Sequence, residues 1–347
     1  AASDVYKRQL LGLCHLFAAG FITLAATRTD YNSLYTLVLL SVMFYMPTIA
    51  LSNSVAYNAL EKAGLDTVTH FPPIRVWGTV GFICAMWVVD LGKMGLSATQ
   101  LYFSATLGLI LGLYSFTLPN CPINRSGGGK SIVDLLGLRA FALFKQRKMA
   151  IFFIFSMLLG MSLQITNAFA DGYIKSFGDT GIHGAKYLGT FGVEHSTILI
   201  SLSQISETLC ILLIPFFLKR FGIKRVMLIA MFAWVLRFAL LGAGNPGPGV
   251  WMFILSMIVY GVAFDFFNIS GSLFVEKETS AAIRSSAQGV FMIMTNGLGA
   301  LIGSYLAGWV VNHYGWPLSW YLFAGFSLVV AIVFAVIFKY KHDPNRI

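Results

Sequence analysis

Ten apolar stretches, each about as long as a membrane-spanning helix, run through this sequence with mostly short connections between them. A helix needs about 20 mostly apolar residues to cross the hydrocarbon core of a bilayer. The stretches fall at about 9–27, 33–57, 72–92, 98–118, 149–171, 195–218, 225–244, 250–274, 287–312 and 318–338. The third can also be drawn from an earlier start, near Asp66. The pattern predicts an all-α polytopic membrane protein.

The composition supports membrane integration and gives no sign of catalysis. The chain is 57% hydrophobic and 11% charged, whereas a soluble domain is about half apolar and a quarter charged. Its four cysteines lack the spacing of a zinc site or a disulfide framework. A P-loop, a nucleophile elbow and a dinucleotide-binding turn are not found in the sequence. We therefore expect no metal, no cofactor and no enzymatic activity, and a membrane-embedded enzyme is a remote alternative.

The positive charge of the chain is distributed unevenly between its loops. A net charge of +10 could indicate a nucleic-acid partner, but the basic residues lie in short loops between spans. Eighteen of the 24 Lys and Arg fall on one side of the predicted membrane and four on the other, with Arg75 and Arg237 inside spans. Basic loops are retained in the cytoplasm. We therefore expect a lipid bilayer rather than nucleic acid as the partner, with both termini cytoplasmic.

The longest connection divides the spans into two groups. It runs from about Asn120 to Lys148, with a Gly/Ser-rich part followed by a basic part, as is typical of a linker. We predict the remainder of an N-terminal bundle at 1–118, a cytoplasmic linker at 119–148 and a six-helix C-terminal bundle at 149–347. Four spans precede the linker and six follow it, whereas many secondary transporters have two halves of six. We expect the natural protein to be longer, with two further N-terminal helices.

Four ionisable residues lie inside the apolar stretches: Arg75, Glu207, Arg237 and Asp265. A charge at the centre of a bilayer costs at least about 2.5–3.5 kcal/mol, so such residues usually face a partner or a water-filled path. Charges of both signs, spread over several spans, indicate a polar route through the membrane. This is typical of a transporter.

The stretch at 72–92 carries a polar and aromatic face. Arg75, Thr79 and Phe82 recur at i, i+4 and i+7, which places them on one side of a helix. Arginine suits an anionic or hydroxyl-rich ligand, threonine can hydrogen-bond it, and phenylalanine can stack on a planar ring. The alternative is that Arg75 extends its guanidinium to the membrane interface.

Two later stretches carry polar pairs about one turn apart. Gln164 and Asn167 form a carboxamide pair that can bind a base or sugar, or join neighbouring helices. Gln204 is followed at i+3 by Glu207, which lies near mid-membrane by residue count. A carboxyl group there can carry a proton. The alternative is a fixed ion pair between Glu207 and an arginine within the spans.

The stretch at 250–274 combines an aromatic face with a charge. Tyr260, Phe264 and Asn268 share one helix face, and Asp265 adjoins it. Aromatic stripes usually serve packing, but packing does not require an ion, so Asp265 favours a functional site. We expect Arg237 to be a structural or gating partner of a carboxylate.

The stretch at 287–312 has a row of small residues. These are Gly297, Gly299, Gly303, Ser304 and Gly308. Small residues let two helix backbones approach closely. We interpret this row as structural.

The loop at 215–225 has the sequence PFFLKRFGIKR. It resembles the loop signature G-x-x-x-D-R-x-G-x-R-R of the major facilitator superfamily, with Pro215 in place of the first glycine and Lys219 in place of the aspartate. Gly222 and the basic spacing are kept. On its own, the loop is better explained as an accumulation of positive charge on the cytoplasmic side, and the retained Gly222, the basic spacing and the two-halves argument together favour the facilitator signature instead.

Longer segments carry a more specific resemblance. They are HFPPIRVWGTVGF at 70–82, LQITN at 163–167, SQISET at 203–208 and YGVAFDFFNIS at 260–270. In these segments the chain resembles bacterial nucleoside:proton symporters, and the likeness runs from about residue 30 to about residue 341.

The resemblance implies a twelve-helix, monomeric carrier of the major facilitator fold in the bacterial inner membrane. Such a carrier imports nucleosides such as uridine or adenosine with protons, by rocking its halves around a central site. Matching motifs imply the following nucleoside contacts: Arg75, Thr79, Phe82, Gln164, Asn167, Gln204, Glu207, Tyr260, Phe264 and Asp265. Proton coupling is expected from Glu207, Asp265 and Arg75. The alternative is a facilitator for another polar solute, such as a sugar.

Overall fold

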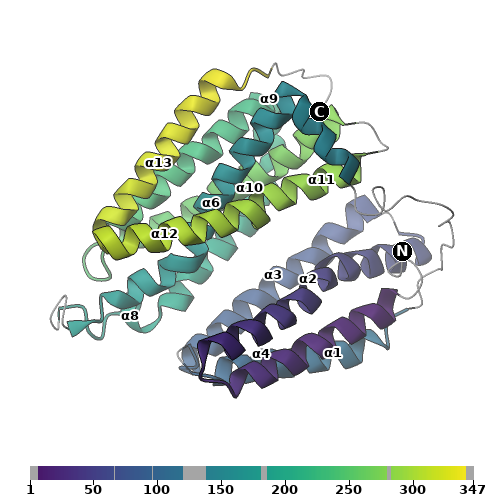
Figure 1. Cartoon of the computed structure of the whole chain (residues 1–347), viewed down its shortest axis with the longest axis horizontal. Helices are drawn as coiled ribbons and strands as arrows, with labels where there is room; N and C mark the ends of the chain where they lie inside the picture. The colour runs from purple at the N-terminus through teal and green to yellow at the C-terminus, as the bar shows by residue number, and fades with distance from the viewer. Residues whose placement is uncertain are drawn as a thin grey trace. The chain divides into compact units, whose positions relative to one another are not determined.

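The computed structural model describes residues 7–65, 67–95, 97–119, 138–180, 186–279 and 283–340, and within these ranges the regular elements are all helices. The chain divides into two compact units, Ala1–Lys130 and Ser131–Ile347, called the first and second unit below. Figure 1 shows both as bundles of long helices. The expected fold class, an all-helical membrane protein, is confirmed.

The first unit contains four long helices. They are α1 (Lys7–Ala26), α2 (Tyr31–Lys62), α3 (Thr67–Leu91) and α4 (Thr99–Ser115). Helix α1 packs against both α2 and α4. It approaches α4 closely, since a Cβ added at Gly12 would lie 3.0 Å from the Gly112 carbonyl oxygen. Small residues therefore join these two helices backbone to backbone.

The second unit contains the remaining elements. They are η2 (Leu138–Lys145), α6 (Arg147–Ser176), α8 (Phe191–Glu194), α9 (Ser196–Ala243), α10 (Val250–Glu278), α11 (Arg284–Met292), η3 (Ile293–Gly299), α12 (Ala300–Tyr314) and α13 (Trp316–Ile337). The predicted linker lies partly outside the described residues, and its end forms η2, which packs against α6 and α11. Helix α9 packs against both α10 and α13.

Helix α9 is two membrane spans joined at a glycine. Its 48 residues are interrupted at Gly222, which has φ 74° and ψ 166°. A positive φ is strained for a residue with a Cβ but not for glycine. The glycine of the facilitator-like loop therefore ends one span and begins the next, and the two predicted spans at 195–218 and 225–244 correspond to its two halves.

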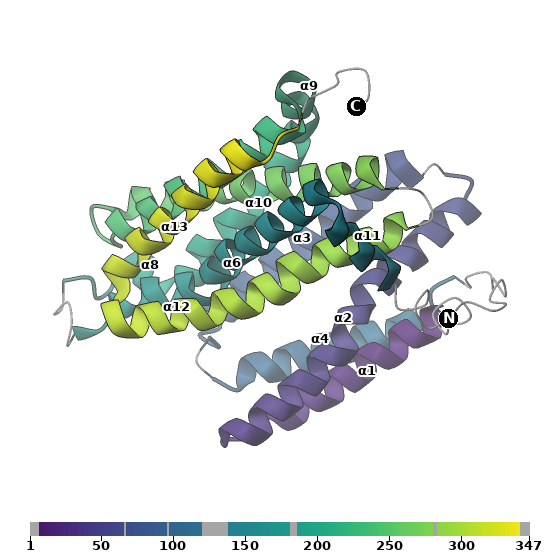
Figure 2. The same ribbon diagram turned by 45° about the horizontal axis from the view of Figure 1, so that its top comes forward.

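The predicted span at 287–312 corresponds to three consecutive elements. Helices α11 and α12 flank η3, a π-helical segment, and the three form one continuous rod in both views (Figures 1 and 2). Segment η3 packs tightly on α6, because a Cβ added at Gly160 would overlap the Thr295 carbonyl oxygen. A Cβ at Gly299 would lie 2.5 Å from the Met157 carbonyl oxygen.

Each of the other predicted spans lies on one helix. The third begins at Thr67, as its earlier start anticipated. Within the described residues, seven helices are long and apolar enough to cross a membrane, with α9 counted once and with α11, η3 and α12 counted together. The core of the second unit is aromatic, and Phe152, Trp234 and Trp320 are almost fully buried there. This core holds α6, α9 and α10 in fixed positions.

Candidate functional site

Seven predicted site residues lie on three helices of the second unit and are called the carboxylate cluster below. They are Gln164 and Asn167 on α6, Gln204 and Glu207 on α9, and Tyr260, Phe264 and Asp265 on α10. Tyr260 and Asp265 are buried, Asn167 is exposed and the other four are half-buried. The cluster therefore extends from the interior of the helix bundle to an accessible surface of the second unit.

Tyr260 lies at the centre of this cluster. Its ring stacks on Phe264 with 5.8 Å between centroids and meets Trp234 edge-on at 6.0 Å. The side chain of Asn167 hydrogen-bonds the phenol, which connects α6 to α10. Offset and edge-on ring pairs of this kind are favourable beyond the area they bury. The arrangement leaves aromatic surface and a carboxamide side by side.

Two acidic groups of the cluster interact with each other. Glu207 acts electrostatically on both Asp265 and Tyr260. Asp265 is only 3% exposed, and its Oδ2 accepts no hydrogen bond from any described residue. Two carboxylates close together in a poorly hydrated site do not both ionise without a large cost. The pair is therefore suited to hold and release a proton.

Close packing of α9 on α10 brings these acids together. A Cβ added at Gly261 would lie 2.6 Å from the Ser206 backbone, and the Ser206 hydroxyl donates to the Ile258 carbonyl oxygen. Ser203 donates to the Met257 sulfur at 3.1 Å. Because Glu207 follows Ser206 and Asp265 lies one turn beyond Gly261, the backbone contact fixes both acids.

Arg237 does not have the carboxylate partner expected from the sequence. Its Nη1 donates to the Ser256 carbonyl oxygen at 2.5 Å and its Nε to Thr166 Oγ1 at 3.4 Å. Its guanidinium carbon lies 4.6 Å from the centre of the Tyr260 ring. Among the described residues, no carboxylate oxygen lies within salt-bridge distance of it. A neutral carbonyl, a hydroxyl and an aromatic face satisfy this cation instead.

The three predicted site residues of the first unit lie on α3. Thr79 is half-buried and Phe82 is 54% exposed. The backbone of Arg75 belongs to α3, but its side chain lies outside the described part of the structure. Their helical spacing is as predicted.

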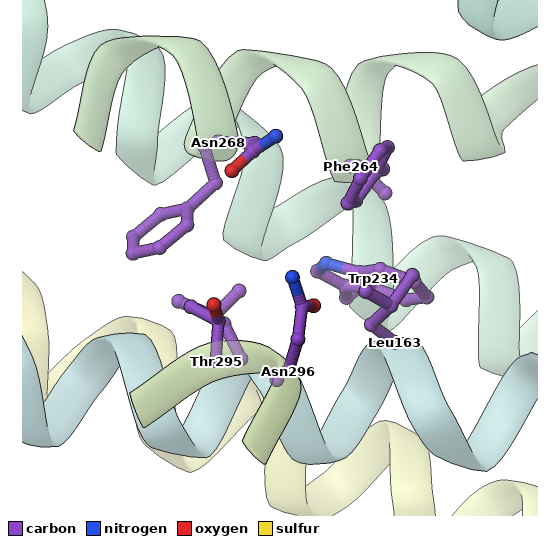
Figure 3. Close-up of a pocket in the computed structure, with 10 residues that line it drawn as sticks. Leu163, Trp234, Phe264, Asn268, Thr295 and Asn296 are labelled. Carbon is purple, nitrogen blue, oxygen red and sulfur yellow. The ribbon is translucent and has the colours of Figure 1, made fainter. Parts of the chain in front are cut away.

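A recess not predicted from the sequence adjoins the carboxylate cluster. It is lined by Leu159, Gly160, Leu163, Trp234, Ala263, Phe264, Phe267, Asn268, Thr295 and Asn296, and its cavity volume is about 20 Å³. In Figure 3, Asn268 and Phe264 lie on the opposite side of this space from Thr295 and Asn296. Asn268 was visible in the sequence on the face of Tyr260 and Phe264. Trp234, Thr295 and Asn296 were missed, because no sequence periodicity relates η3 to α9 and α10.

The fold and these buried polar groups define a multi-pass membrane carrier of the major facilitator type. A bacterial homologue of the human lysosomal transporter Spinster shares the fold alone, with a TM-score of 0.62 at 13% identity, over 96% of this chain and 83% of that one. Residues 4–343 match the family described as Nucleoside H+ symporter, so this chain belongs to that family of transporters, which are not enzymes. The chain is thus a nucleoside–proton symporter.

Two curated relatives resemble this chain about equally. It is 51% identical to nucleoside permease NupG of Escherichia coli and 50% identical to the xanthosine permease of the same organism, each over 96% of this chain and 81% of the relative. A crystal structure of nucleoside transporter NupG superposes with a TM-score of 0.87 at 50% identity, covering 98% of this chain and 85% of that one. Overall similarity does not distinguish between the two relatives' substrates.

Proposed function

We propose that this chain imports nucleosides into bacteria with protons and that the carboxylate cluster binds both. The observation that carries the proposal is the interacting acid pair Glu207 and Asp265 beside the stacked rings of Tyr260 and Phe264. Asp265 carries the proton, because it is the more buried acid and has an oxygen without a hydrogen-bond partner among the described residues. Arg75, Thr79 and Phe82 are further contacts on the basis of the sequence motif.

The chemistry of a nucleoside matches these groups. Its base is planar and can stack on an aromatic face, at about 1–3 kcal/mol per stacked base by analogy with nucleic-acid proteins. Its ribose and base edges donate and accept hydrogen bonds, as do the carboxamides of Gln164, Asn167 and Gln204. Names of the two relatives support a nucleoside as substrate.

The driving force is sufficient for accumulation. One proton that moves down a potential of 100 mV supplies about 2.3 kcal/mol. This corresponds to about fifty-fold accumulation of a nucleoside carried with it. Binding of the proton and the nucleoside at one cluster supports the coupling of their transport. Protonation of Asp265 removes its repulsion with Glu207 and thereby changes the charge of the nucleoside site.

Uptake of radiolabelled uridine tests the proposal. The chain is expressed in cells without their own nucleoside permeases, and uptake is measured with and without a protonophore. We expect accumulation that the protonophore abolishes, and its loss in Asp265→Asn and Glu207→Gln. Asp30→Asn is the matched control, because Asp30 is an exposed carboxylate at a helix end and its exchange should leave uptake unchanged. Unchanged uptake in both single variants and their double would refute the proton site.

The proposal includes a monomer in the bacterial inner membrane with a cytoplasmic C-terminus. It is supported by the uneven distribution of Lys and Arg between the two sides of the predicted membrane. Reporter fusions at the loop containing Lys186 and at the C-terminus test the orientation. We expect a periplasmic signal from the first and a cytoplasmic signal from the second, and light scattering in detergent should give the mass of one chain.

A further inference from the structure

We infer that the recess beside the carboxylate cluster reads the exocyclic group of the nucleobase, through the carboxamides of Asn268 and Asn296. This inference rests on the proposed function and adds its specificity determinant. A carboxamide donates to a carbonyl group and accepts from an amino group. With the N–H groups of Asn268 and Asn296 turned towards the ligand, the recess accepts a carbonyl group at this edge, as in uracil, in preference to the amino group of cytosine.

The two carboxamides have unused hydrogen-bonding capacity. The side chain of Asn268 makes no hydrogen bond to any described residue, although it is half-buried. Asn296 donates only to the Met292 sulfur, at 3.8 Å, which leaves its carbonyl oxygen and a second N–H available. The Thr295 hydroxyl has already used its one donor, since it donates to the Phe291 carbonyl oxygen at 3.0 Å. Among these three side chains, the N–H donors available to a ligand therefore belong to the two asparagines.

The π-helical turn of η3 places Asn296 in the recess. A π-turn is rare, interrupts the regular spacing of side chains and is frequent at functional sites. Here it is held by backbone contacts, because a Cβ added at Gly160 would overlap the Thr295 carbonyl oxygen. The residue before Asn296 is thus fixed against α6, and the position from which Asn296 extends is preorganised.

The recess is continuous with the carboxylate cluster through shared residues. Phe264 lines the recess and also stacks on Tyr260. Trp234 lines it and meets Tyr260 edge-on. Leu163 precedes Gln164 on α6. A base stacked on the aromatic residues of the cluster can therefore extend its edge into the recess, which Phe264 and Trp234 border in Figure 3.

The size of the recess indicates which part of the ligand it takes. Its volume of about 20 Å³ is enough for one water-sized group and far below what a whole nucleoside requires. Apolar residues form most of its wall, so the hydrogen bonds that the recess offers to a polar group come from Asn268, which is half-buried, and Asn296, which is exposed. Sites of this kind discriminate strongly between ligands that do and do not satisfy them.

Uridine and cytidine test the inference, because they differ at this edge and share ribose and ring size. Asn268→Asp and Asn296→Asp keep the side-chain size and remove both N–H donors. We expect the ratio of uridine to cytidine uptake to fall about five- to tenfold in at least one variant, since one hydrogen bond to a carbonyl is lost. Asn312→Asp is the matched control, because Asn312 is exposed on α12 and outside the recess.

The ratio of the dissociation constants for uridine and cytidine is also measured on purified protein. A variant that binds nucleosides but does not transport them therefore still gives a specificity ratio. A uridine-to-cytidine ratio within twofold of wild type in both variants overturns the inference. Uridine uptake by wild type upholds the proposed function in that case. An equal loss of affinity for both nucleosides also overturns the inference. A wild-type chain that transports and binds neither uridine nor cytidine overturns this inference, and it overturns the proposed function as well if xanthosine is neither bound nor transported.

Discussion

Arg237 and Asp265 are both almost completely buried in the second unit, at 1% and 3% exposure, but they differ in how many hydrogen-bonding partners surround them. Arg237 on α9 has a carbonyl oxygen, a hydroxyl and an aromatic ring for its guanidinium. Asp265 on α10 has an oxygen without any hydrogen bond from a described residue and a second acid nearby. A buried charge with hydrogen-bonding partners stabilises one structure. A buried carboxylate without a hydrogen-bond donor favours its protonated form and can therefore change its protonation.

The two centres share one neighbour, which makes the comparison testable. Tyr260 lies under the Arg237 guanidinium and interacts electrostatically with Asp265. Variants at the three positions should therefore separate stability from coupling. The expected effect is largest at Asp265, smaller at Arg237 and smaller again at Tyr260.

Asp265→Asn should abolish accumulation while leaving exchange of nucleoside intact. Asparagine keeps the shape of the side chain and cannot take up a proton. We expect the roughly fifty-fold accumulation that one proton supports to fall to none. Counterflow in preloaded vesicles, which needs no proton gradient, should continue. Retained accumulation would show that Asp265 resembles Arg237 in being structural.

Arg237→Met should lower stability rather than coupling. Methionine keeps much of the volume but removes hydrogen bonds from a charged donor, and the Ser256 carbonyl oxygen loses its side-chain donor. We expect a loss of about 2 kcal/mol in the free energy of unfolding. Thermal unfolding in detergent measures it, with Arg237→Lys as an intermediate. Transport per folded molecule should stay proton-dependent, and a stable but uncoupled variant would contradict the structural role.

The sequence predicted where the spans lie, because hydropathy depends on composition along the chain. It also predicted that Tyr260, Phe264 and Asp265 lie near one another, because one helix fixes their spacing. It did not predict the partners of Arg237. A buried charge shows that partners are needed, but packing between helices decides whether they are carboxylates or the Ser256 carbonyl oxygen.

The glycine row of the predicted span at 287–312 shows a second limit. Gly299 and Gly303 do lie where the backbone of α6 approaches closely, as the row of small residues predicted. Gly297 is exposed and faces only Ile293 of its own segment. A regular helical period assumed for the whole stretch missed the π-turn, and with it the position of Asn296.

Tyr260→Phe should separate the two centres. It keeps the ring under Arg237 and against Phe264 but removes the hydroxyl that Asn167 hydrogen-bonds. The free energy of unfolding should change far less than in Arg237→Met. We expect uridine uptake at low concentration to fall about fivefold, as for loss of one hydrogen bond. A stability loss as large as that of Arg237→Met would instead place Tyr260 in the structural centre.

Asp30 offers the opposite case, a carboxylate whose hydrogen bonding is satisfied outside the spans. It caps α2, and its Oδ2 accepts from the Ser33 amide at 2.8 Å. This backbone hydrogen bond lowers the pKa of the Asp30 carboxyl. Because the folded pKa is the lower one, its stabilisation is present above the unfolded pKa and is lost as pH falls through the folded pKa.

Thermal unfolding of wild type and Asp30→Asn between pH 7 and pH 3 measures this small effect. Asparagine also caps helices but does not titrate. We expect wild type to lose stability relative to Asp30→Asn only at the acid end, below the ordinary aspartate pKa of about 3.9. A difference that appeared near neutral pH would require a different titrating group. Because this cap lies outside the carboxylate cluster, titration of Asp30 should leave the proton dependence of uptake near neutral pH unchanged. This result would distinguish Asp30, whose carboxylate is hydrogen-bonded, from Asp265, the carboxylate proposed to carry the proton.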